Sequence, residues 1–109
     1  MKFLISGKVV KGKGYGRKLG YPTVNLEVDS TDLPVKGVYQ GEAVLRGEKY
    51  RAGIILTPDG AVEAHLIGYE GDAYGEIVTL ELKKFLRDYR NFKTEAELIA
   101  QIEKDLKMC

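Results

Sequence analysis

Six short runs of apolar and β-branched residues, separated by turn-forming residues, restrict the fold of this chain more than any other feature of its sequence. Several of the runs alternate apolar with polar side chains, as strands with one buried face do. They cover residues 2–10, 24–28, 38–45, 49–56, 61–67 and 76–85. We predict an all-β fold in which six antiparallel strands close, or nearly close, into a barrel, because closure leaves no exposed strand edge.

The connections between these runs carry turn signals. Residues 46–48, Arg-Gly-Glu, separate two runs and predict a hairpin with a short loop that contains glycine. Residues 57–60, Thr-Pro-Asp-Gly, predict a tight turn, since proline sets φ and glycine accepts a positive φ. Residues 68–75, which hold three glycines, predict a longer loop before the last strand.

A helix is predicted only after the last strand. Thr94 and Glu97 match a capping box, in which the threonine side chain serves a free N–H of the first turn. The apolar residues that follow recur at spacings of three and four, at Leu98, Ile99, Ile102 and Leu106. Such a stripe is typical of a helix that packs on a core, so we expect it to lie on the barrel rather than bind a partner.

Composition predicts one soluble globular domain over residues 1–109, with 44% hydrophobic and 30% charged residues. The 17 basic and 16 acidic residues leave a net charge of +1, which argues against a global field for nucleic acid, so any anion site is local. The single cysteine, Cys109, forms no internal disulfide, and no apolar run has the length of a membrane span. We expect a cytoplasmic monomer that binds neither nucleic acid nor membrane.

The segment Gly12–Gly20, with three alternate glycines followed by Arg17 and Lys18, is the candidate phosphate-binding element. Glycine lets backbone N–H groups approach an anion closely. Residues 7–14 nearly match a P-loop, with Gly7, Gly12 and Lys13 at the expected spacing. We reject that motif, since Gly14 stands where a P-loop has serine or threonine, and a proline and a strand follow rather than a helix. The GxGxG spacing of the alternate glycines also fails the dinucleotide fingerprint. A structural glycine hairpin remains the alternative.

Thr23 and Asn25 are candidate metal ligands. They follow Pro22 at the start of a predicted strand and are two residues apart, so their side chains share one face. A hydroxyl and an amide oxygen are donors of the kind that a partly hydrated magnesium ion accepts. Together with the basic residues upstream, they favour phosphate binding over a purely structural role.

Glu63 and His65 share a face of the fifth predicted strand, while their apolar neighbours occupy the other face. Glu63 is a candidate general base, and the alternative is a solvated or salt-bridged strand glutamate. For His65, which has no cysteine or histidine neighbours at ligand spacing, we expect a hydrogen-bonded structural role rather than metal ligation.

Aromatic residues gather in the last third of the chain, with Arg87 and Arg90 among them. The aromatic residues are Tyr69, Tyr74, Phe85, Tyr89 and Phe92. Rings beside guanidinium groups can hold a planar heteroaromatic ligand, or they can form the seam between barrel and helix. We expect Phe85 to pack in the core, because it ends an alternating strand.

These motifs, taken in order, resemble the riboflavin kinase family of the bacterial and eukaryotic type, whose core motif is Pro-Thr-Ala-Asn. Residues 22–25 read Pro-Thr-Val-Asn, after the glycines and Arg17. The likeness continues through Val62-Glu63-Ala64-His65 and covers essentially the whole chain. Its other elements are Pro34, residues 37–39 (Gly-Val-Tyr), residues 72–76 (Asp-Ala-Tyr-Gly-Glu), residues 85–87 (Phe-Leu-Arg) and residues 91–92 (Asn-Phe).

The resemblance implies a six-stranded Greek-key barrel with a C-terminal helix, corresponding to the kinase domain alone, without the adenylyltransferase (FAD synthetase) domain common in bacterial members. It implies transfer of the ATP γ-phosphoryl group to the 5'-hydroxyl of riboflavin to form FMN, with magnesium or another divalent cation. Glu63 would be the base, and Thr23 and Asn25 would hold ATP and the metal. Gly12 and Arg17 would line the phosphates, and the flavin would contact Leu66, Gly68, Tyr74, Arg87, Arg90 and Phe92. A non-catalytic flavin- or nucleotide-binding barrel is the alternative.

Overall fold

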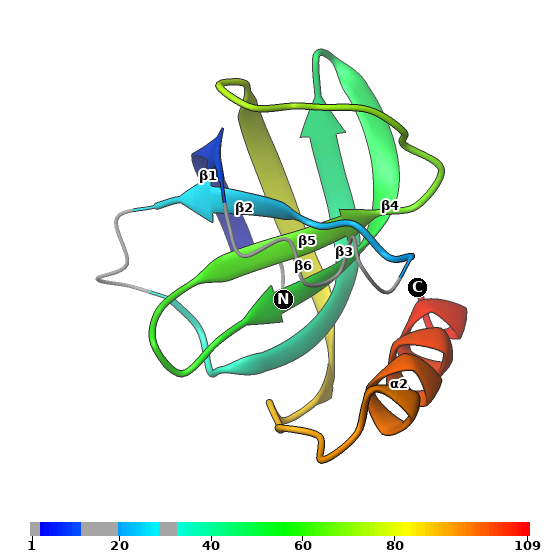
Figure 1. Cartoon of the computed structure of the whole chain (residues 1–109). Helices are drawn as coiled ribbons and strands as arrows, with labels where there is room; N and C mark the ends of the chain where they lie inside the picture. The colour runs from blue at the N-terminus through cyan, green and yellow to red at the C-terminus, as the bar shows by residue number, and fades with distance from the viewer. Residues whose placement is uncertain (1–2, 12–19, 29–32) are drawn as a thin grey trace.

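The computed structural model describes residues 3–11, 20–28 and 33–109, and these residues form six strands and a helix (Figure 1). The elements are β1 (Phe3–Val10), β2 (Val24–Glu27), β3 (Gly37–Leu45), β4 (Glu48–Leu56), β5 (Val62–Leu66), β6 (Ile77–Arg87) and α2 (Glu95–Lys107). Each predicted strand is present, with bounds that differ from the prediction by one or two residues. The predicted helix is present as α2.

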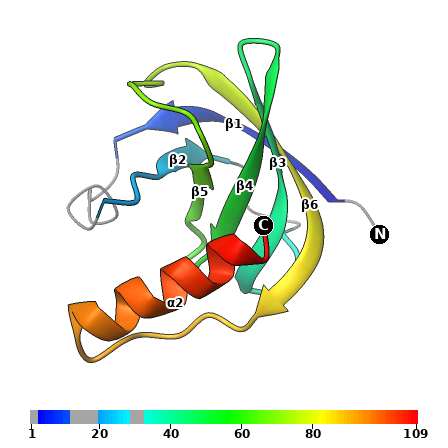
Figure 2. The same cartoon turned by 90° about the vertical axis from the view of Figure 1, so that its right-hand side faces the viewer.

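The strands form a closed antiparallel barrel in the order β1-β2-β5-β4-β3-β6, with β6 paired to both β3 and β1. Strands β3, β4 and β5 follow one another, and β6 returns to lie beside β3, which is the Greek-key arrangement. Figure 2 shows α2 outside this barrel, beyond the ends of β4 and β6. The prediction of an all-β Greek-key barrel with a C-terminal helix is confirmed.

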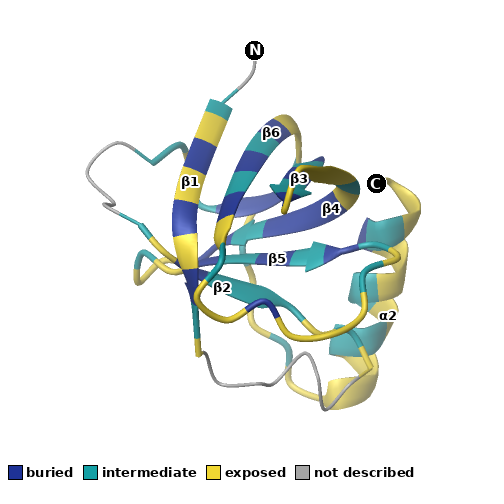
Figure 3. Cartoon of the chain, turned by 90° about the horizontal axis from the view of Figure 1, so that it is seen from above, coloured by how far each residue is buried: buried dark blue, intermediate teal, exposed yellow. Residues whose placement is uncertain are grey.

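Alternation along the strands separates a buried interior from a polar exterior (Figure 3). Val62, Ala64 and Leu66 of β5 are at most 3% exposed, while the residues between them are half-buried on the outer face. The predicted alternation of β6 at Val78, Leu80 and Leu82 is confirmed in the same way. The barrel interior is therefore the hydrophobic core, and polar side chains of β5 point away from it.

Gly7 lies in β1 and serves the packing of β1 against β2. A Cβ at this position would come within 2.5 Å of the carbonyl oxygen of Glu27, so only glycine lets the two strands approach this closely. This strand position agrees with the rejection of a P-loop, because Gly7 is the first glycine of the near match to that motif.

The hairpin between β3 and β4 has a two-residue turn, one residue shorter than predicted. Leu45 pairs with Glu48, and both Arg46 (φ +52°) and Gly47 (φ +80°) have positive φ. Positive φ at both central positions is the type I′ geometry, whose twist matches that of paired strands. The prediction missed this because arginine rarely takes a positive φ.

Helix α2 begins at the predicted cap, and its apolar stripe is only half-buried. The hydroxyl of Thr94 accepts a hydrogen bond from the N–H of Glu97 at 3.2 Å. The four apolar residues of the stripe are half-buried, and the buried residue of the helix is Asp105. Leu106 packs on Gly53 of β4, where a Cβ would approach its side chain to 3.2 Å. Within the described ranges, no helix has the length and apolar character needed to cross a membrane.

The prediction that Phe85 packs in the core is wrong. Its side chain contacts the ring of Tyr39 edge-on, with centroids 5.2 Å apart, but the residue is 42% exposed. The β3–β6 ladder shifts register between Gln40 and Gly41, so that Phe85 pairs with Tyr39 and shares its face. Phe85 nevertheless lies near the C-terminal end of β6, at the end of the barrel rather than inside it.

Candidate functional site

Four polar residues form a two-by-two square on the outer face of β2 and β5. The ladder pairs Asn25 with Glu63, and the same register extended by one residue sets Thr23 opposite His65. Because Val24 and Ala64 form the intervening pair and face the core, the side chains of the square share the outer face. The two candidate metal ligands and the candidate base are therefore brought together, and His65 joins them.

A hydrogen bond joins two diagonally opposite members of this square, Thr23 and Glu63. The hydroxyl of Thr23 donates to Oε1 of Glu63 at 3.3 Å, between residues 40 positions apart in the chain. Diagonal contacts of this kind are within reach of neighbouring antiparallel strands. The alternative of a purely solvated glutamate does not describe Glu63, which is half-buried and accepts a hydrogen bond. A carboxylate held beside a hydroxyl and an amide can accept a proton from a ligand's hydroxyl group.

His65 has the hydrogen-bonded role predicted for it. Its Nδ1 lies 2.7 Å from the carbonyl oxygen of Pro22, and its ring meets the ring of Tyr21 edge-on. The histidine thus contacts the corner that leads into Thr23.

A pocket of about 460 Å³ opens beside the square. Its walls come from β1, the start of β2, the end of β5 and the loop between β5 and β6. The lining residues are Val9, Pro22, Thr23, Val24, Ala64, Leu66, Tyr69, Glu70, Gly71, Asp72, Ala73 and Tyr74. Thr23 belongs to both the square and the pocket, so it links the carboxylate of Glu63 to a cavity large enough for a planar ligand.

The loop between β5 and β6, residues 67–76, is here called the pocket loop. It is held from outside by Arg46, a residue that the sequence did not single out. Its guanidinium donates to Glu76 Oε1 at 2.9 Å, to the hydroxyl of Tyr69 at 3.2 Å and to the carbonyl of Asp72 at 3.5 Å. These bonds raise the pKa of Arg46, with the bond to Glu76 as the main cause. The turn of the β3–β4 hairpin is thereby tied to the loop that lines the pocket.

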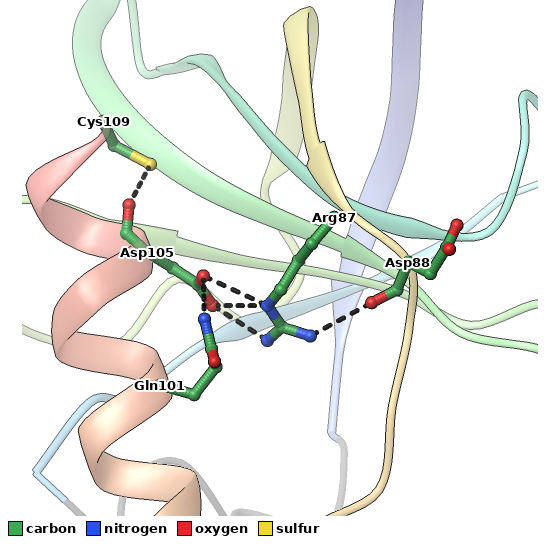
Figure 4. A network of polar contacts seen from close by, with 5 residues as sticks. All are labelled: Arg87, Asp88, Gln101, Asp105 and Cys109. Atoms are coloured by element: carbon green, nitrogen blue, oxygen red, sulfur yellow. Dashed lines mark hydrogen bonds and ion pairs between the residues drawn. The ribbon is translucent and has the colours of Figure 1, made fainter.

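Arg87 lies in a network with α2 (Figure 4). Its Nε and Nη2 donate to the carboxylate of Asp105 at 2.8–3.2 Å, and Gln101 donates to the same carboxylate at 2.9 Å. The side chains of the ion pair are 20% and 12% exposed. Sequence reasoning missed Asp105, although an acidic residue three positions after Ile102 on the apolar stripe is a signal of a buried partner.

The ring of Phe92 contacts two guanidinium groups. The carbon Cζ of Arg90 is 4.7 Å from its ring centroid, and that of Arg87 is 5.7 Å away. This is the arrangement of arginine and aromatic residues that the sequence indicated, and it lies next to α2.

A model of the Flavokinase family, described as riboflavin kinase, matches residues 1–109. The chain belongs to the riboflavin kinase family. A bifunctional riboflavin kinase/FMN adenylyltransferase of Escherichia coli (strain K12) is 38% identical over 94% of this chain and 36% of that protein. The chain thus spans about a third of the length of this curated relative.

Two solved structures support the family's fold. A crystal structure of a macrolide-efflux protein from Streptococcus pneumoniae has a TM-score of 0.86 and 33% identity, over 95% of this chain and 37% of that one. A riboflavin kinase from Trypanosoma brucei has a TM-score of 0.77 and 21% identity, over 98% of this chain and 74% of that one. The second likeness shows the fold alone.

Eight of the eleven residues that the riboflavin kinase resemblance indicated fall into two groups. Thr23, Asn25, Glu63, Leu66 and Tyr74 lie at the square or the pocket. Arg87, Arg90 and Phe92 lie beside α2, and none of the three is among the residues that line the pocket in the described part of the chain. Gly68 follows β5 with φ +86° and turns the chain into the pocket loop. Gly12 and Arg17 lie outside the described residues.

The donors near Glu63 fit a magnesium ion better than a transition metal. The described ranges contain no cluster of three or more His, Cys, Asp or Glu residues suited to a metal ion. The hydroxyl of Thr23 and the amide of Asn25 are instead neutral oxygen donors beside one carboxylate. Magnesium is a hard cation that takes oxygen ligands and keeps waters and substrate phosphates among them, so it needs few protein ligands.

Proposed function

We propose that this chain transfers the γ-phosphoryl group of ATP to the 5'-hydroxyl of riboflavin and so forms FMN. The observation that carries this proposal is the contact of Thr23, which lines the pocket, with the carboxylate of Glu63. It supplies a carboxylate that can orient an attacking hydroxyl. Beside it lie neutral oxygen donors that can hold a magnesium ion together with a nucleotide's phosphates. Membership of the riboflavin kinase family and the name of the Escherichia coli relative support the same reaction.

Glu63 would act on the acceptor. Phosphoryl transfer asks the protein mainly to position the reactants and to balance charge, with a carboxylate that accepts the proton of the attacking hydroxyl. The hydrogen bond from Thr23 holds one carboxylate oxygen on the outer face. A glutamate at this position favours an enzyme over the alternative, a barrel that only binds flavin or nucleotide, since binding needs no proton acceptor.

Thr23 and Asn25 would hold magnesium together with the phosphates of ATP. The support is chemical, because both side chains present oxygen on the same face as Glu63. The ion supplies neutralisation of charge on the transferring phosphoryl group. Gly12 and Arg17 would line the phosphates, as the family resemblance implies.

We further propose that the pocket accepts the adenine ring and that riboflavin lies on the α2 side of Glu63. The resemblance assigned Leu66 and Tyr74 to the flavin, but both residues line the same pocket as Thr23, the proposed ATP ligand. We therefore assign them to the nucleotide instead. Glu63 pairs with Ile55 of β4 on its other side, and Leu106 of α2 covers Gly53 of that strand. Arg87, Arg90 and Phe92 therefore suit a flavin approaching from the helix side.

A single assay tests the proposed reaction. The purified chain is incubated with riboflavin, ATP and magnesium chloride, and FMN is followed by chromatography. We expect FMN to form only when all three are present. Absence of FMN across varied nucleotides and divalent ions, with riboflavin still bound, would instead support the non-catalytic barrel.

We also propose that the chain acts in the cytoplasm as a monomer, without nucleic acid or membrane partners. Size-exclusion chromatography tests the oligomeric state.

A further inference from the structure

His65 is the member of the outer-face square to which the proposed reaction gives no role. Its Nδ1 is 2.7 Å from the carbonyl oxygen of Pro22. Its ring also meets that of Tyr21, with centroids 6.0 Å apart and planes at 74°. One side chain of β5 therefore contacts both residues that precede Thr23.

These contacts lie where backbone pairing of β2 ends. The described β2–β5 pairs run from Val24 to Leu26, and Pro22 has no N–H with which to extend the ladder. Gly20 turns the chain with φ +88° just upstream. The side chain of His65 therefore fixes backbone that the β2–β5 ladder does not reach.

The bond acts on the peptide group that joins Pro22 to Thr23. A carbonyl oxygen only accepts hydrogen bonds, so Nδ1 of His65 carries the hydrogen and donates it. Since the peptide group is planar, holding the oxygen of Pro22 also orients the Cα of Thr23. The hydroxyl of Thr23, which reaches both Glu63 and the pocket, depends on that orientation.

We propose that His65 is a positioning residue for Thr23. It touches neither nucleotide nor flavin, and it acts by clamping the Tyr21–Pro22 corner so that the Thr23 hydroxyl faces the nucleotide side of the site. The inference rests on the proposed function for its kinetic consequence. The clamp itself is a property of the protein without ligand.

Two substitutions separate the hydrogen bond from the ring contact. His65→Asn places an amide nitrogen at the position of Nδ1 and so keeps the donor, but it loses the ring that meets Tyr21. His65→Phe keeps the ring and loses the donor. We expect His65→Phe to weaken binding of magnesium with a non-hydrolysable ATP analogue by roughly three- to tenfold, as loss of one neutral hydrogen bond commonly does. We expect His65→Asn to bind it as the wild type does.

The kinetics distinguish positioning from general damage. His65→Phe should raise KM for magnesium-ATP while KM for riboflavin stays unchanged, because Thr23 serves the nucleotide. His65→Asn should restore the wild-type KM. Equal impairment of the two variants, or a normal KM for magnesium-ATP in His65→Phe, overturns the proposal. His65→Ala takes the place of His65→Phe should the larger ring lower the melting temperature.

A measurement without ligand keeps this inference separable from the proposed function. The amide resonance of Thr23 in a ¹⁵N-correlated NMR spectrum should move in His65→Phe and stay close to its wild-type position in His65→Asn. An unmoved resonance in His65→Phe overturns the clamp, whether or not the wild type makes FMN. Failure of the wild type to make FMN, with the resonance moving as expected, counts against the proposed function alone.

Discussion

At the scale of single residues, the charge of Glu63 is the property most directly open to test. Glu63→Gln keeps the size of the side chain and can still accept the hydrogen bond from Thr23, but it removes the proton acceptor. We expect kcat for FMN formation to fall by roughly 10²- to 10⁴-fold, the usual contribution of a general base. Steady-state kinetics and calorimetric titration with riboflavin should show a modest change in affinity.

The matched control for this substitution is Glu27→Gln. Glu27 is an exposed glutamate two residues after Asn25 on β2, so it shares the outer face of that strand. Its loss should leave kcat unchanged. Turnover of Glu63→Gln close to that of the wild type would defeat the role of Glu63 as base.

Thr23 is expected to act through its hydroxyl rather than its methyl group. Thr23→Ala should raise KM for magnesium-ATP and the magnesium concentration at half-maximal rate, because it removes both the oxygen donor and the bond to Glu63. Thr23→Ser restores the hydroxyl and should recover most of the wild-type activity. A magnesium titration of FMN formation checks both, and an unchanged magnesium requirement in Thr23→Ala would contradict this role.

The residues of the square could be predicted from the sequence because their chemistry and their two-residue spacing appear in single short segments. Arg46 could not, because its three acceptors lie on a loop about thirty positions away, brought near by barrel closure. Asp105 was missed for a similar reason. Its partner Arg87 is on another element, and only their contact explains an aspartate that is 9% exposed.

At the scale of elements, we expect the Arg87–Asp105 ion pair to hold α2 on the barrel. Arg87→Gln removes a guanidinium that makes three bonds to a part-buried carboxylate. We expect the free energy that holds the helix on the barrel to fall by about 1.5–3 kcal/mol, the range for hydrogen bonds to charged groups. Lys84→Gln, at an exposed position of the same strand, is the control.

Cys109 provides the measurement for this prediction. Its thiol donates to the carbonyl of Asp105, and burial raises the pKa of the thiol, so at pH 8 little thiolate is present in the docked state. Undocking exposes the thiol and returns its pKa toward the ordinary value. Alkylation at pH 8 should therefore be faster in Arg87→Gln than in the wild type or in Lys84→Gln. Equal rates in all three would show that the pair does not hold the helix.

The strands were predictable because a period of two translates directly into inward and outward positions. The prediction failed for Phe85, which the period of two set by Leu80 and Leu82 turns to the opposite face. The register shift in the β3–β6 ladder pairs Phe85 with Tyr39 instead, near the end of the strand, and a shift of this kind depends on the partner strand rather than on local sequence. For α2, periodicity showed which face is apolar but not how deeply that face is buried.

At the scale of the whole molecule, stability rests on the barrel interior. Leu80→Ala, at a fully buried position of β6, should lower the free energy of unfolding by about 2–5 kcal/mol. Ile77→Ala, at a position that is 60% exposed on the same strand, should change it by less than about 0.5 kcal/mol. Urea unfolding followed by fluorescence measures both, and equal effects would contradict an interior core.

Closure of the barrel limits where the chain can change in length. β5 pairs with β2 on one side and with β4 on the other, so its register is set twice. A shift of one residue would turn Glu63 into the core and Ala64 out of it, which would bury a carboxylate and dismantle the square together. Insertions and deletions are therefore compatible with the fold at the turn of residues 57–61, in the pocket loop or between β6 and α2, but not within β5.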